Sequence, residues 1–515
     1  MSKIILAINA GSSSVKVSVF SYNPTTSTNN PPSKDSSNQS DTSLTELAQI
    51  QISNLTASPA LLTYTLGNQP PSQKNSPLPA SISTPRTAFQ KILSTLLQDP
   101  DLPDLNSPAD IAVAVHRIVH GGGDFSTPTF LDDDETVAHL ERLSDLAPLH
   151  NGGALEIVAA VRELGGSSKG DGEGDGKGGQ GQGKVRNLGL FDNMFHSSLP
   201  AEEREYMISP AKAKSEGLRR YGFHGLSCAF ITRAVGAWLE RNHQPKPSLP
   251  PPSQEQQQQQ HPTPPRSGPN LIALHLGSGC SATCIRAGIS IATSMGLTPV
   301  SGLPGATRSG DVDPSLIFHY THSAGKLSTA SAAAADAQAS GGGGGKMHIT
   351  RAEEILNKES GWKSLAGTTD FGRLCAMAFP ASSDSKPTDS SNTNDEDQKL
   401  ARLAFDILVT RIVDFIAAYY VKLRGDVDAL VFAGGIGEKG SILREAVVEK
   451  IQCLGFELDR DLNANPAFKG GDDVVAEIGK SGAKHRVVIC QTDEQREMAR
   501  ECVGVMGGEF SSGGR

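Results

Sequence analysis

Three short segments rich in Gly and Ser have the composition of phosphate-binding turns. Residues 9–14 read NAGSSS with Lys16 close behind, so backbone N–H groups and an ammonium could converge on phosphate oxygens. Residues 275–281, HLGSGCS, repeat this design, and residues 434–438, GGIGE, follow an apolar run and precede a helical pattern near Ser441. Each segment alone could be an ordinary tight turn. All three in this order indicate a nucleotide or phosphate site.

Two arginines and an aspartate could supply phosphoryl-transfer chemistry. A phosphoryl group in transfer carries spread negative charge, so its site needs cations and aimed donors more than a strong nucleophile. Arg308 is flanked by small residues, and Arg117 and Asp192 each follow a predicted strand. Guanidinium groups can hold a carboxylate or a phosphoryl group bidentately. The alternative for the arginines is surface ion pairing with Asp311 or Asp124.

The histidines and cysteines are less specific. His224 follows Tyr221-Gly222-Phe223 and could donate to a developing oxyanion, whereas His150, His196 and His275, taken singly, are better explained as core histidines. The seven cysteines are odd in number and scattered, which favours a reducing compartment over a disulfide framework. We expect Cys280 and Cys284 to be small buried residues on one strand face, not metal ligands.

The elements that must position these residues alternate between strands and helices, which predicts an α/β fold. The clearest helix spans residues 398–424, where apolar residues recur at helical spacing and Gly425 follows. Strands are predicted at 3–8, 15–20, 111–115, 187–191, 271–276, 281–286, 429–432 and 486–490. Low-complexity breaks, interpreted as surface insertions, lie at about 22–43, 68–79, 165–184, 243–269, 323–346 and 382–398.

Composition excludes several classes of function. The chain has 515 residues and a formal net charge of -9, with no basic stripe, so nucleic acid and anionic membranes are not expected partners. The first residues, MSKIILAINAG, suggest neither a signal peptide nor a membrane span. We therefore expect a cytoplasmic protein.

The order of these loops resembles the superfamily of sugar kinases, heat-shock chaperone ATPases and actin. Finer motifs resemble acetate kinase and its relatives among the short-chain acid kinases, over nearly all the chain outside the insertions. The motifs are NAGSSSVK at 9–16, HRIVHGG at 116–122, PLHN at 148–151, FDNMFH at 191–196, RRYGFHG at 219–225, HLGSG at 275–279, TSMGLTPVSGLPGATRSGDVDP at 293–314 and TDEQ at 492–495.

The resemblance implies two related domains of mixed sheet with flanking helices, of the ribonuclease H-like type, around a nucleotide cleft. We place them at 1–197 and 198–494, with a C-terminal helix at 495–515 returning to the first. The implied reaction is reversible, direct in-line transfer of the ATP γ-phosphoryl group to acetate, giving acetyl phosphate and ADP. The implied cofactor is Mg²⁺, or Mn²⁺ in its place, and the implied assembly is a homodimer.

The resemblance also assigns roles to individual residues. His224 and Arg308 match residues taken to stabilise the transition state, and Asp192 matches the family's catalytic Asp. A carboxylic acid, with a reference pKa near ~4, is already ionised at neutral pH, so we expect Asp192 to orient Arg117 or a metal-bound water. The metal positions are Asn9 and Glu494. The acceptor site is Arg117, Val119, Leu149, His150, Phe223 and Pro299; the nucleotide site is Ser12, Ser14, Lys16, His275, Leu276, Gly277, Ser278, Gly279, Asp370, Arg373, Gly435, Ile436, Gly437, Glu438 and Lys439.

Three departures from the family pattern lie on the nucleotide side. Ser278 and Lys439 stand where Asn is usual, and the segment from Asp370 to Arg373 has one extra residue relative to an Asp-x-Arg contact. A pyrophosphate-linked variant is therefore an alternative. A propionate or butyrate kinase is another, because a methyl-sized pocket discriminates only modestly between short acids. A nucleotide-binding regulator of the same fold is the alternative that is not an enzyme.

Overall fold

The computed structural model describes residues 2–11, 13–24, 43–67, 69–143, 148–164, 185–242, 268–320, 350–380, 395–468 and 473–512. Ser12 and most of five of the predicted insertions lie outside these ranges. The side chains of Leu149 and His150 are also outside the description, although both residues belong to a helix.

The first sheet has eight strands in the order β5-β4-β3-β2-β1-β6-β8-β7. Strands β1 and β2 form the predicted antiparallel hairpin, and β6 and β8 extend the sheet in parallel beside β1. One correction concerns the Pro/Ser/Gln patch at 68–79, because residues 73–77 form an exposed edge strand instead of an irregular break. The strands are β1 (Lys3–Ala10), β2 (Val15–Tyr22), β3 (Leu44–Ser53), β4 (Leu61–Leu66), β5 (Gln73–Pro77), β6 (Ile111–Ile118), β7 (Thr129–Phe130) and β8 (Arg186–Phe191).

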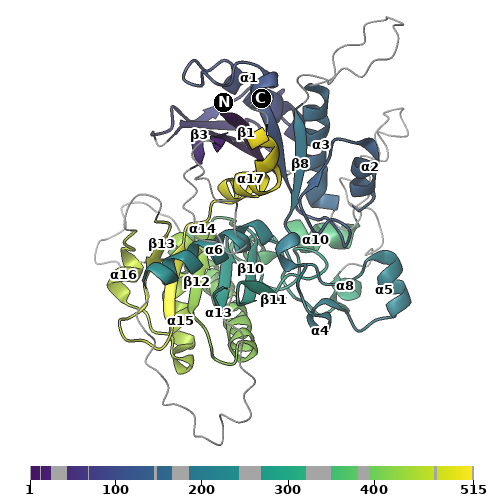
Figure 1. Ribbon diagram of the computed structural model, residues 1–515. Helices are drawn as coiled ribbons and strands as arrows, with labels where there is room; N and C mark the ends of the chain where they lie inside the picture. Colours follow the sequence, from purple (N-terminus) through teal and green to yellow (C-terminus); the bar gives the residue numbers. More distant parts are fainter. Residues whose placement is uncertain are drawn as a thin grey trace, which may run out of the picture.

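Helices cover both faces of this sheet. On one face α1 (Pro85–Leu97) and α3 (Pro148–Leu164) bury Ile4, Leu6 and Ile8 of β1. On the other face α17 (Glu494–Ser512) covers the alternate residues Ile5 and Ala7, because successive side chains of a strand point to opposite faces. We call this sheet with its helices the first lobe (Figure 1).

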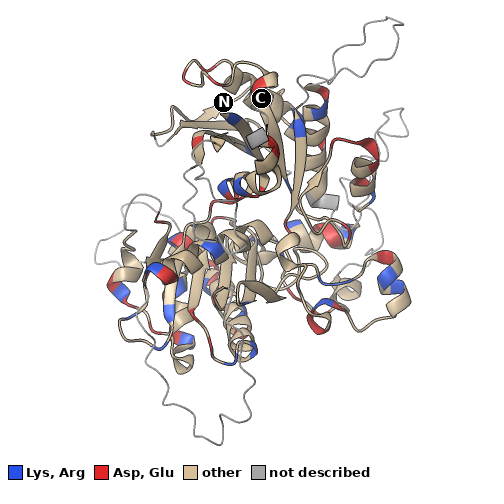
Figure 2. Ribbon diagram, viewed as in Figure 1, with Lys and Arg blue, Asp and Glu red and all other residues tan. Residues whose placement is uncertain are grey.

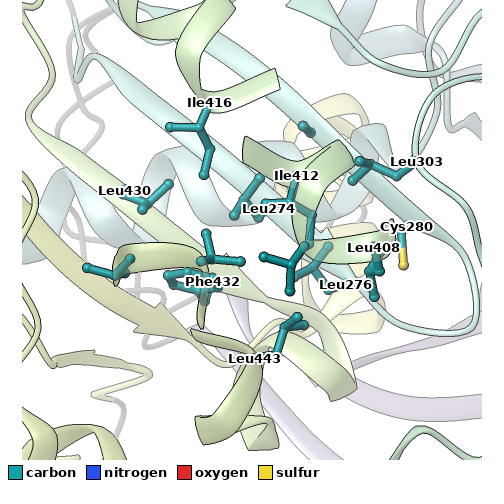
Figure 3. Close-up of a cluster of buried hydrophobic side chains, with 14 of the residues drawn as sticks. Leu274, Leu276, Cys280, Leu303, Leu408, Ile412, Ile416, Leu430, Phe432 and Leu443 are labelled. Atoms are coloured by element: carbon teal, nitrogen blue, oxygen red, sulfur yellow. The ribbon is translucent and has the colours of Figure 1, made fainter. Parts of the chain in front are cut away.

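The second sheet has six strands in the order β11-β10-β9-β12-β14-β13. Its core lies between the sheet and α13 (Asp395–Lys422) with α15 (Ser441–Lys450), where Leu274, Phe432 and Ile412 pack together (Figure 3). The opposite face is covered by α6 (Gly225–Arg241). The strands are β9 (Leu271–Leu276), β10 (Cys280–Arg286), β11 (Ile289–Thr293), β12 (Ala429–Ala433), β13 (Val475–Glu477) and β14 (Arg486–Cys490). These elements form the second lobe.

The two sheets have the same topology over five strands each. The order β3-β2-β1-β6-β8 in the first lobe corresponds to β11-β10-β9-β12-β14 in the second, with a hairpin followed by two parallel strands in each. Both of the first two Gly/Ser loops join the strands of such a hairpin. The prediction of an α/β fold with two related mixed sheets is confirmed.

The third Gly-rich segment differs from its prediction. Residues predicted as a loop form a short helix, α14 (Gly434–Lys439), directly after β12. Gly434 has a φ of +73°, and a Cβ there would lie 2.7 Å from the carbonyl oxygen of Leu276. Glycine therefore lets this helix begin against the neighbouring strand.

Shorter helices and turns connect these elements. They are α2 (Asp134–Leu143), α4 (Ala201–Arg204), α5 (Pro210–Glu216), α8 (Leu316–Tyr320), α10 (Arg351–Lys358), α11 (Gly361–Ala366), α12 (Phe371–Ala378), α16 (Arg460–Ala464) and the 3₁₀ turns Pro108–Asp110, Met194–His196 and Gln452–Leu454. Acidic and basic residues are interspersed over both lobes (Figure 2). Among the described residues, no helix has the length and apolar character needed to cross a membrane.

Candidate active site

Four side chains from distant parts of the sequence meet at one edge of the first sheet. Asn9 and Arg117 are register partners on the parallel strands β1 and β6, and Asp192 directly follows β8. Arg117 donates from Nε to both carboxylate oxygens of Asp192 at 3.1 Å and from Nη2 to Oδ2 at 2.5 Å. Its Nη1 donates to Asn9 Oδ1 at 3.0 Å, and Asn9 Nδ2 donates to Oε2 of Glu494 at 3.1 Å. We call these four residues the Arg117 cluster.

Burial strengthens the interactions between the charged groups of this cluster. The Asp192 side chain is only 1% exposed and that of Arg117 is 19% exposed. Burial raises the pKa of Asp192, against the opposing effect of Arg117. Burial also acts to raise the pKa of Glu494, but Arg117, His275, Lys16 and the hydrogen bond from Asn9 together lower it. Arg117 is therefore a fixed cation, held by carboxylates that water hardly reaches.

The donor set of the Arg117 cluster fits a divalent cation bound with a phosphate. Two carboxylates and one guanidinium leave an excess of one negative charge beside the amide oxygen of Asn9. No group of three His, Cys, Asp or Glu among the described residues could hold a metal on its own. Mg²⁺ does not need one, because it commonly uses one or two carboxylates, substrate phosphates and waters.

The second lobe presents His224 and Arg308 beside the second phosphate hairpin. A Cβ on Gly279 would lie 2.7 Å from Nη1 of Arg308, so glycine leaves room for this guanidinium. Nε2 of His224 lies at ordinary contact distance from the same point, 3.5 Å. His224 caps α6 in a left-handed conformation, with φ of +59°. Its Nδ1 lies 2.9 Å from Oγ of Ser281, which leaves Nε2 as the ring nitrogen facing Gly279.

The histidines at this edge are neutral. Burial lowers the pKa of His224 well below its usual range, and the permanent cations Arg117 and Arg308 add to this effect. Burial likewise lowers the pKa of His275, whose Nδ1 lies 2.7 Å from Oγ of Ser227. The two imidazole rings are 4.3 Å apart. His224 can therefore act as a neutral hydrogen-bond donor without adding charge beside the arginines.

A close backbone crossing joins the two halves of the site. The N–H of Gly225 donates to the carbonyl oxygen of Asp192 at 2.8 Å. A Cβ on Gly225 would lie 2.0 Å from that oxygen, so α6 can begin there only with glycine. Nε2 of His196 lies 2.9 Å from the carbonyl oxygen of Phe223, which precedes His224. The crossing places Asp192 and His224 at one junction.

Some of the residues predicted to bind the carboxylate acceptor lie together. Val119 packs with Phe223 in a small apolar cluster that also contains Tyr221, Met295 and Leu297. Pro299 is buried in the same segment as Met295 but is not a member of this cluster. Sequence reasoning did not single out Met295, which is fully buried; its only signal was its place in the TSMGLTP motif.

A cavity of about 620 Å³ lies between α12 and the Gly-rich helix α14. Of the predicted nucleotide residues, Asp370, Gly435, Ile436 and Lys439 line it. The remaining lining residues are Phe371, Gly372, Cys375, Ala376, Phe379, Gly440, Ser441 and Ile442, which sequence reasoning missed although the helical period of α12 carried a signal for Cys375 and Phe379.

Other predicted nucleotide residues lie away from the cavity lining. Arg373 and Gly437 do not line it, and Leu276 is a core residue whose side chain packs inside the second lobe. Glu438 instead accepts hydrogen bonds from Thr492, from N at 3.3 Å and Oγ1 at 3.4 Å. Ser14 lies in the turn of the first hairpin and Lys16 in strand β2. Gly277, Ser278 and Gly279 form the turn of the second hairpin.

Comparisons with known proteins agree over nearly the whole chain. A family model described as "Acetokinase family" matches residues 4–246, 255–341 and 344–500. The probable acetate kinase of Neurospora crassa is 43% identical over 513 residues, covering 98% of this chain and 94% of that protein. The probable acetate kinase of Emericella nidulans is 43% identical over 507 residues, covering 98% of each chain.

Solved structures have the same fold. The acetate kinase of Porphyromonas gingivalis superposes with a TM-score of 0.63 at 25% identity, covering 98% of this chain and all of that one. A propionate kinase from Francisella tularensis gives a TM-score of 0.66 at 24% identity, covering 97% of this chain and 98% of that one.

Proposed function

Because the chain belongs to the acetokinase family and is a phosphotransferase with a carboxyl group as acceptor, we propose that it transfers the γ-phosphoryl group of ATP to acetate. The products are acetyl phosphate and ADP, and the reaction is reversible. The observation that carries this proposal is that Arg117 and Arg308, guanidinium groups from different lobes, both lie close enough to the neutral His224 to lower its pKa. This pair of cations suits one carboxylate and one phosphoryl group in the same site.

The transfer is a direct in-line displacement. One oxygen of the acetate carboxylate forms a bond to the γ-phosphorus, and the bond between that phosphorus and the bridging oxygen of ADP breaks, with its electron pair leaving on ADP. No proton has to be removed, since the acceptor is already ionised at neutral pH. Arg117 holds the carboxylate. Arg308 and Nε2 of His224 donate to the phosphoryl oxygens as charge spreads over them.

Asp192 then acts on Arg117 and not on the acceptor. Its two oxygens accept three contacts from the guanidinium, which fixes the plane and direction of that group. A buried carboxylate so engaged has little capacity left to act as a general base. We assign Asp192 the orientation of Arg117 and of a metal-bound water.

Mg²⁺, or Mn²⁺ in its place, would be held in the Arg117 cluster by Asn9 and Glu494. The ion would supply charge neutralisation between the phosphate oxygens of the nucleotide. Lys16 lies close enough to Glu494 to lower its pKa, so its ammonium reaches the same edge of the site.

The cavity beside α14 is the proposed site of the adenine ring. Its apolar walls, Phe371, Phe379 and Ile436, suit a flat aromatic base, and a volume of about 620 Å³ lies within the range of ligand pockets. Pyrophosphate has no base to fill this space. The cavity therefore favours ATP over the pyrophosphate-linked alternative, despite Ser278 and Lys439.

Trapping acyl phosphate as its hydroxamate tests the proposed reaction. We expect product with ATP and acetate, less with propionate and butyrate, and none with pyrophosphate. The Arg117→Ala and Arg308→Ala variants should each lose at least about 100-fold in kcat, the range reported for removal of one transition-state donor. Folded protein that forms no hydroxamate with any donor would refute the kinase proposal and favour a nucleotide-binding regulator.

We also propose a cytoplasmic homodimer. All seven cysteines are free thiols, as expected in a reducing compartment. Helix α8 exposes large apolar side chains, Phe318 at 73% and Tyr320 at 63%, which a partner subunit could cover. Light scattering after gel filtration should give twice the chain mass, and a monomer at micromolar concentration would contradict the dimer.

A further inference from the structure

The loop that carries Arg308 is held from two sides by backbone hydrogen bonds. On one side the N–H of Ala306 donates to the carbonyl oxygen of Ser278 in the second phosphate hairpin, at 2.9 Å. Within the loop the N–H of Gly305 donates to the carbonyl oxygen of Arg308 at 3.0 Å. The backbone at Arg308 is thereby tied to the same hairpin whose Gly279 lies against its guanidinium.

On the other side the same loop is bonded by residues 356–363, which comprise the end of α10, the two connecting residues and the first turn of α11. The N–H groups of Ser360, Trp362 and Lys363 donate to three consecutive carbonyl oxygens of the loop at 3.0–3.2 Å. The N–H of Ser309 donates back to the carbonyl oxygen of Leu356 at 3.0 Å. The Thr307 hydroxyl adds a bond to the carbonyl oxygen of Asn357 at 2.7 Å. We call residues 356–363 the Arg308 clamp.

The clamp approaches closely only because residue 361 is glycine. A Cβ on Gly361 would lie 2.1 Å from the carbonyl oxygen of Gly305 and 2.9 Å from the carbonyl carbon and oxygen of Ala306. These are backbone atoms, which cannot turn aside as a flexible side chain would. A side chain at this position would have to push the clamp and the Arg308 loop apart.

We propose that Gly361 is a positioning residue for catalysis, because it lets the clamp set where the guanidinium of Arg308 lies. Thr307 is its side-chain partner in this role. The inference rests on the proposed function, in which Arg308 stabilises the transferring phosphoryl group. A displacement of about 1 Å at a reacting group can cost on the order of 100-fold in rate, so small shifts of this loop matter.

The surroundings indicate that a substitution at Gly361 would move the loop and leave the lobe folded. A cavity of about 240 Å³ adjoins the clamp and is lined by Gly361, Trp362 and Ser309. This space allows the turn to retreat from the Arg308 loop without disturbing the sheet. Trp362 and Ala306, beside this contact, belong to the core of the second lobe, so thermal unfolding of Gly361→Ala has to show that the variant is folded.

The chain offers a matched control at the other end of α11. Gly367 has a φ of +68°, almost the same as the +67° of Gly361, but a Cβ there would have no atom within 4 Å. Alanine therefore meets a similar positive φ at both positions and a clash at only one. We expect Gly361→Ala to lower kcat by about 10- to 100-fold and Gly367→Ala to change it by less than about threefold. The KM values for ATP and acetate should change by less than about threefold in both variants.

The Arg308→Ala background decides whether the effect passes through Arg308. If it does, adding Gly361→Ala to Arg308→Ala will not lower the residual kcat further, because residues that act as a unit are not additive. Full additivity, or near-normal kcat in folded Gly361→Ala, would overturn the inference. Near-normal kcat in Arg308→Ala alone would instead contradict the catalytic role proposed for Arg308. This variant therefore distinguishes a failure of the proposed function from a failure of the inference about Gly361.

A second pair of variants keeps the inference testable if Gly361→Ala fails to fold. Thr307→Val removes the hydroxyl that bonds to Asn357, and Thr307→Ser keeps it. We expect the valine variant to lower kcat and the serine variant to restore it, with unchanged circular dichroism in both. Equal kcat values for the two would overturn the role of the clamp.

Discussion

Replacing Asp192 with asparagine should separate orientation of Arg117 from base catalysis. Asparagine has nearly the same shape but lacks the charge and offers only one acceptor oxygen to a guanidinium that now makes three contacts. A hydrogen bond to a charged group is worth about 1.5–3 kcal/mol, and water cannot replace it at a side chain that is 1% exposed. Loss of about 3 kcal/mol corresponds to a fall of about 100-fold in kcat, at 1.36 kcal/mol for each factor of ten.

The assay is hydroxamate formation at saturating ATP and acetate, with enough Mg²⁺ that weakened metal binding does not limit the rate. Asp132→Asn is the control, because Asp132 follows β7 and pairs with Arg186 of β8 at 3.5 Å but lies outside the Arg117 cluster. We expect near-normal kcat for the control. Thermal unfolding of each variant shows whether the protein under assay is folded.

A double-mutant cycle with Arg117→Ala then tests the route of the effect. If Asp192 works by orienting Arg117, the double variant will have about the same kcat as Arg117→Ala alone. Near-normal kcat in Asp192→Asn would refute an essential role for this carboxylate. A full 100-fold loss on top of Arg117→Ala would refute orientation as its mechanism and return Asp192 to the role of a base.

Three further predictions concern other parts of the molecule. Cys375→Trp should fill the cavity beside α14 and raise KM for ATP at least about tenfold, with KM for acetate unchanged. The same KM for ATP in the variant and the unchanged protein would contradict the adenine site. Met295→Ala should remove side-chain volume next to Phe223, so that kcat/KM for propionate relative to acetate rises by about tenfold in the hydroxamate assay. An unchanged ratio would place the acyl group elsewhere. Acid should destabilise the fold, since burial lowers the pKa of three histidines to about 4. Between pH 6.5 and 4 the unfolded chain binds protons that the folded chain does not, so stability falls with pH by about 2 kcal/mol per histidine at pH 5. Thermal unfolding midpoints that stay constant between pH 7 and 5 would contradict this. The histidines are His116, His120 and His196.

The sequence predicted those parts of the fold and the site that depend on local pattern. The strands β9 and β12 read as continuous apolar runs because helices cover both of their faces. Arg117 and Asp192 each follow a predicted strand, and parallel neighbouring strands end at one edge of a sheet, so these side chains could be expected to meet. The helix α13 was predicted within a few residues of its observed bounds.

Features that depend on distant partners could not be predicted in this way. Two glycines among the first residues of α14 oppose a helix, but buried Arg444 donates to the carbonyl oxygens of Gly437 and Glu438 at its end and stabilises it. Strand β5 is polar, since an edge strand gains from backbone pairing and needs no apolar face. The Arg308 clamp joins segments about fifty residues apart, and no periodicity in either segment signals the contact.

The position of α17 has a consequence for how the protein is made. The face of the first sheet formed by Ile5, Ala7, Val113 and Val115 is covered by Met498, Cys502 and Met506 (Figure 1). During synthesis this apolar face is therefore without its own cover until residues 494–512 have left the ribosome. Glu494 arrives with the same helix, so a nascent chain cannot complete its Arg117 cluster before it has buried that surface. The Arg117 cluster is therefore complete only when α17 is docked on the first sheet.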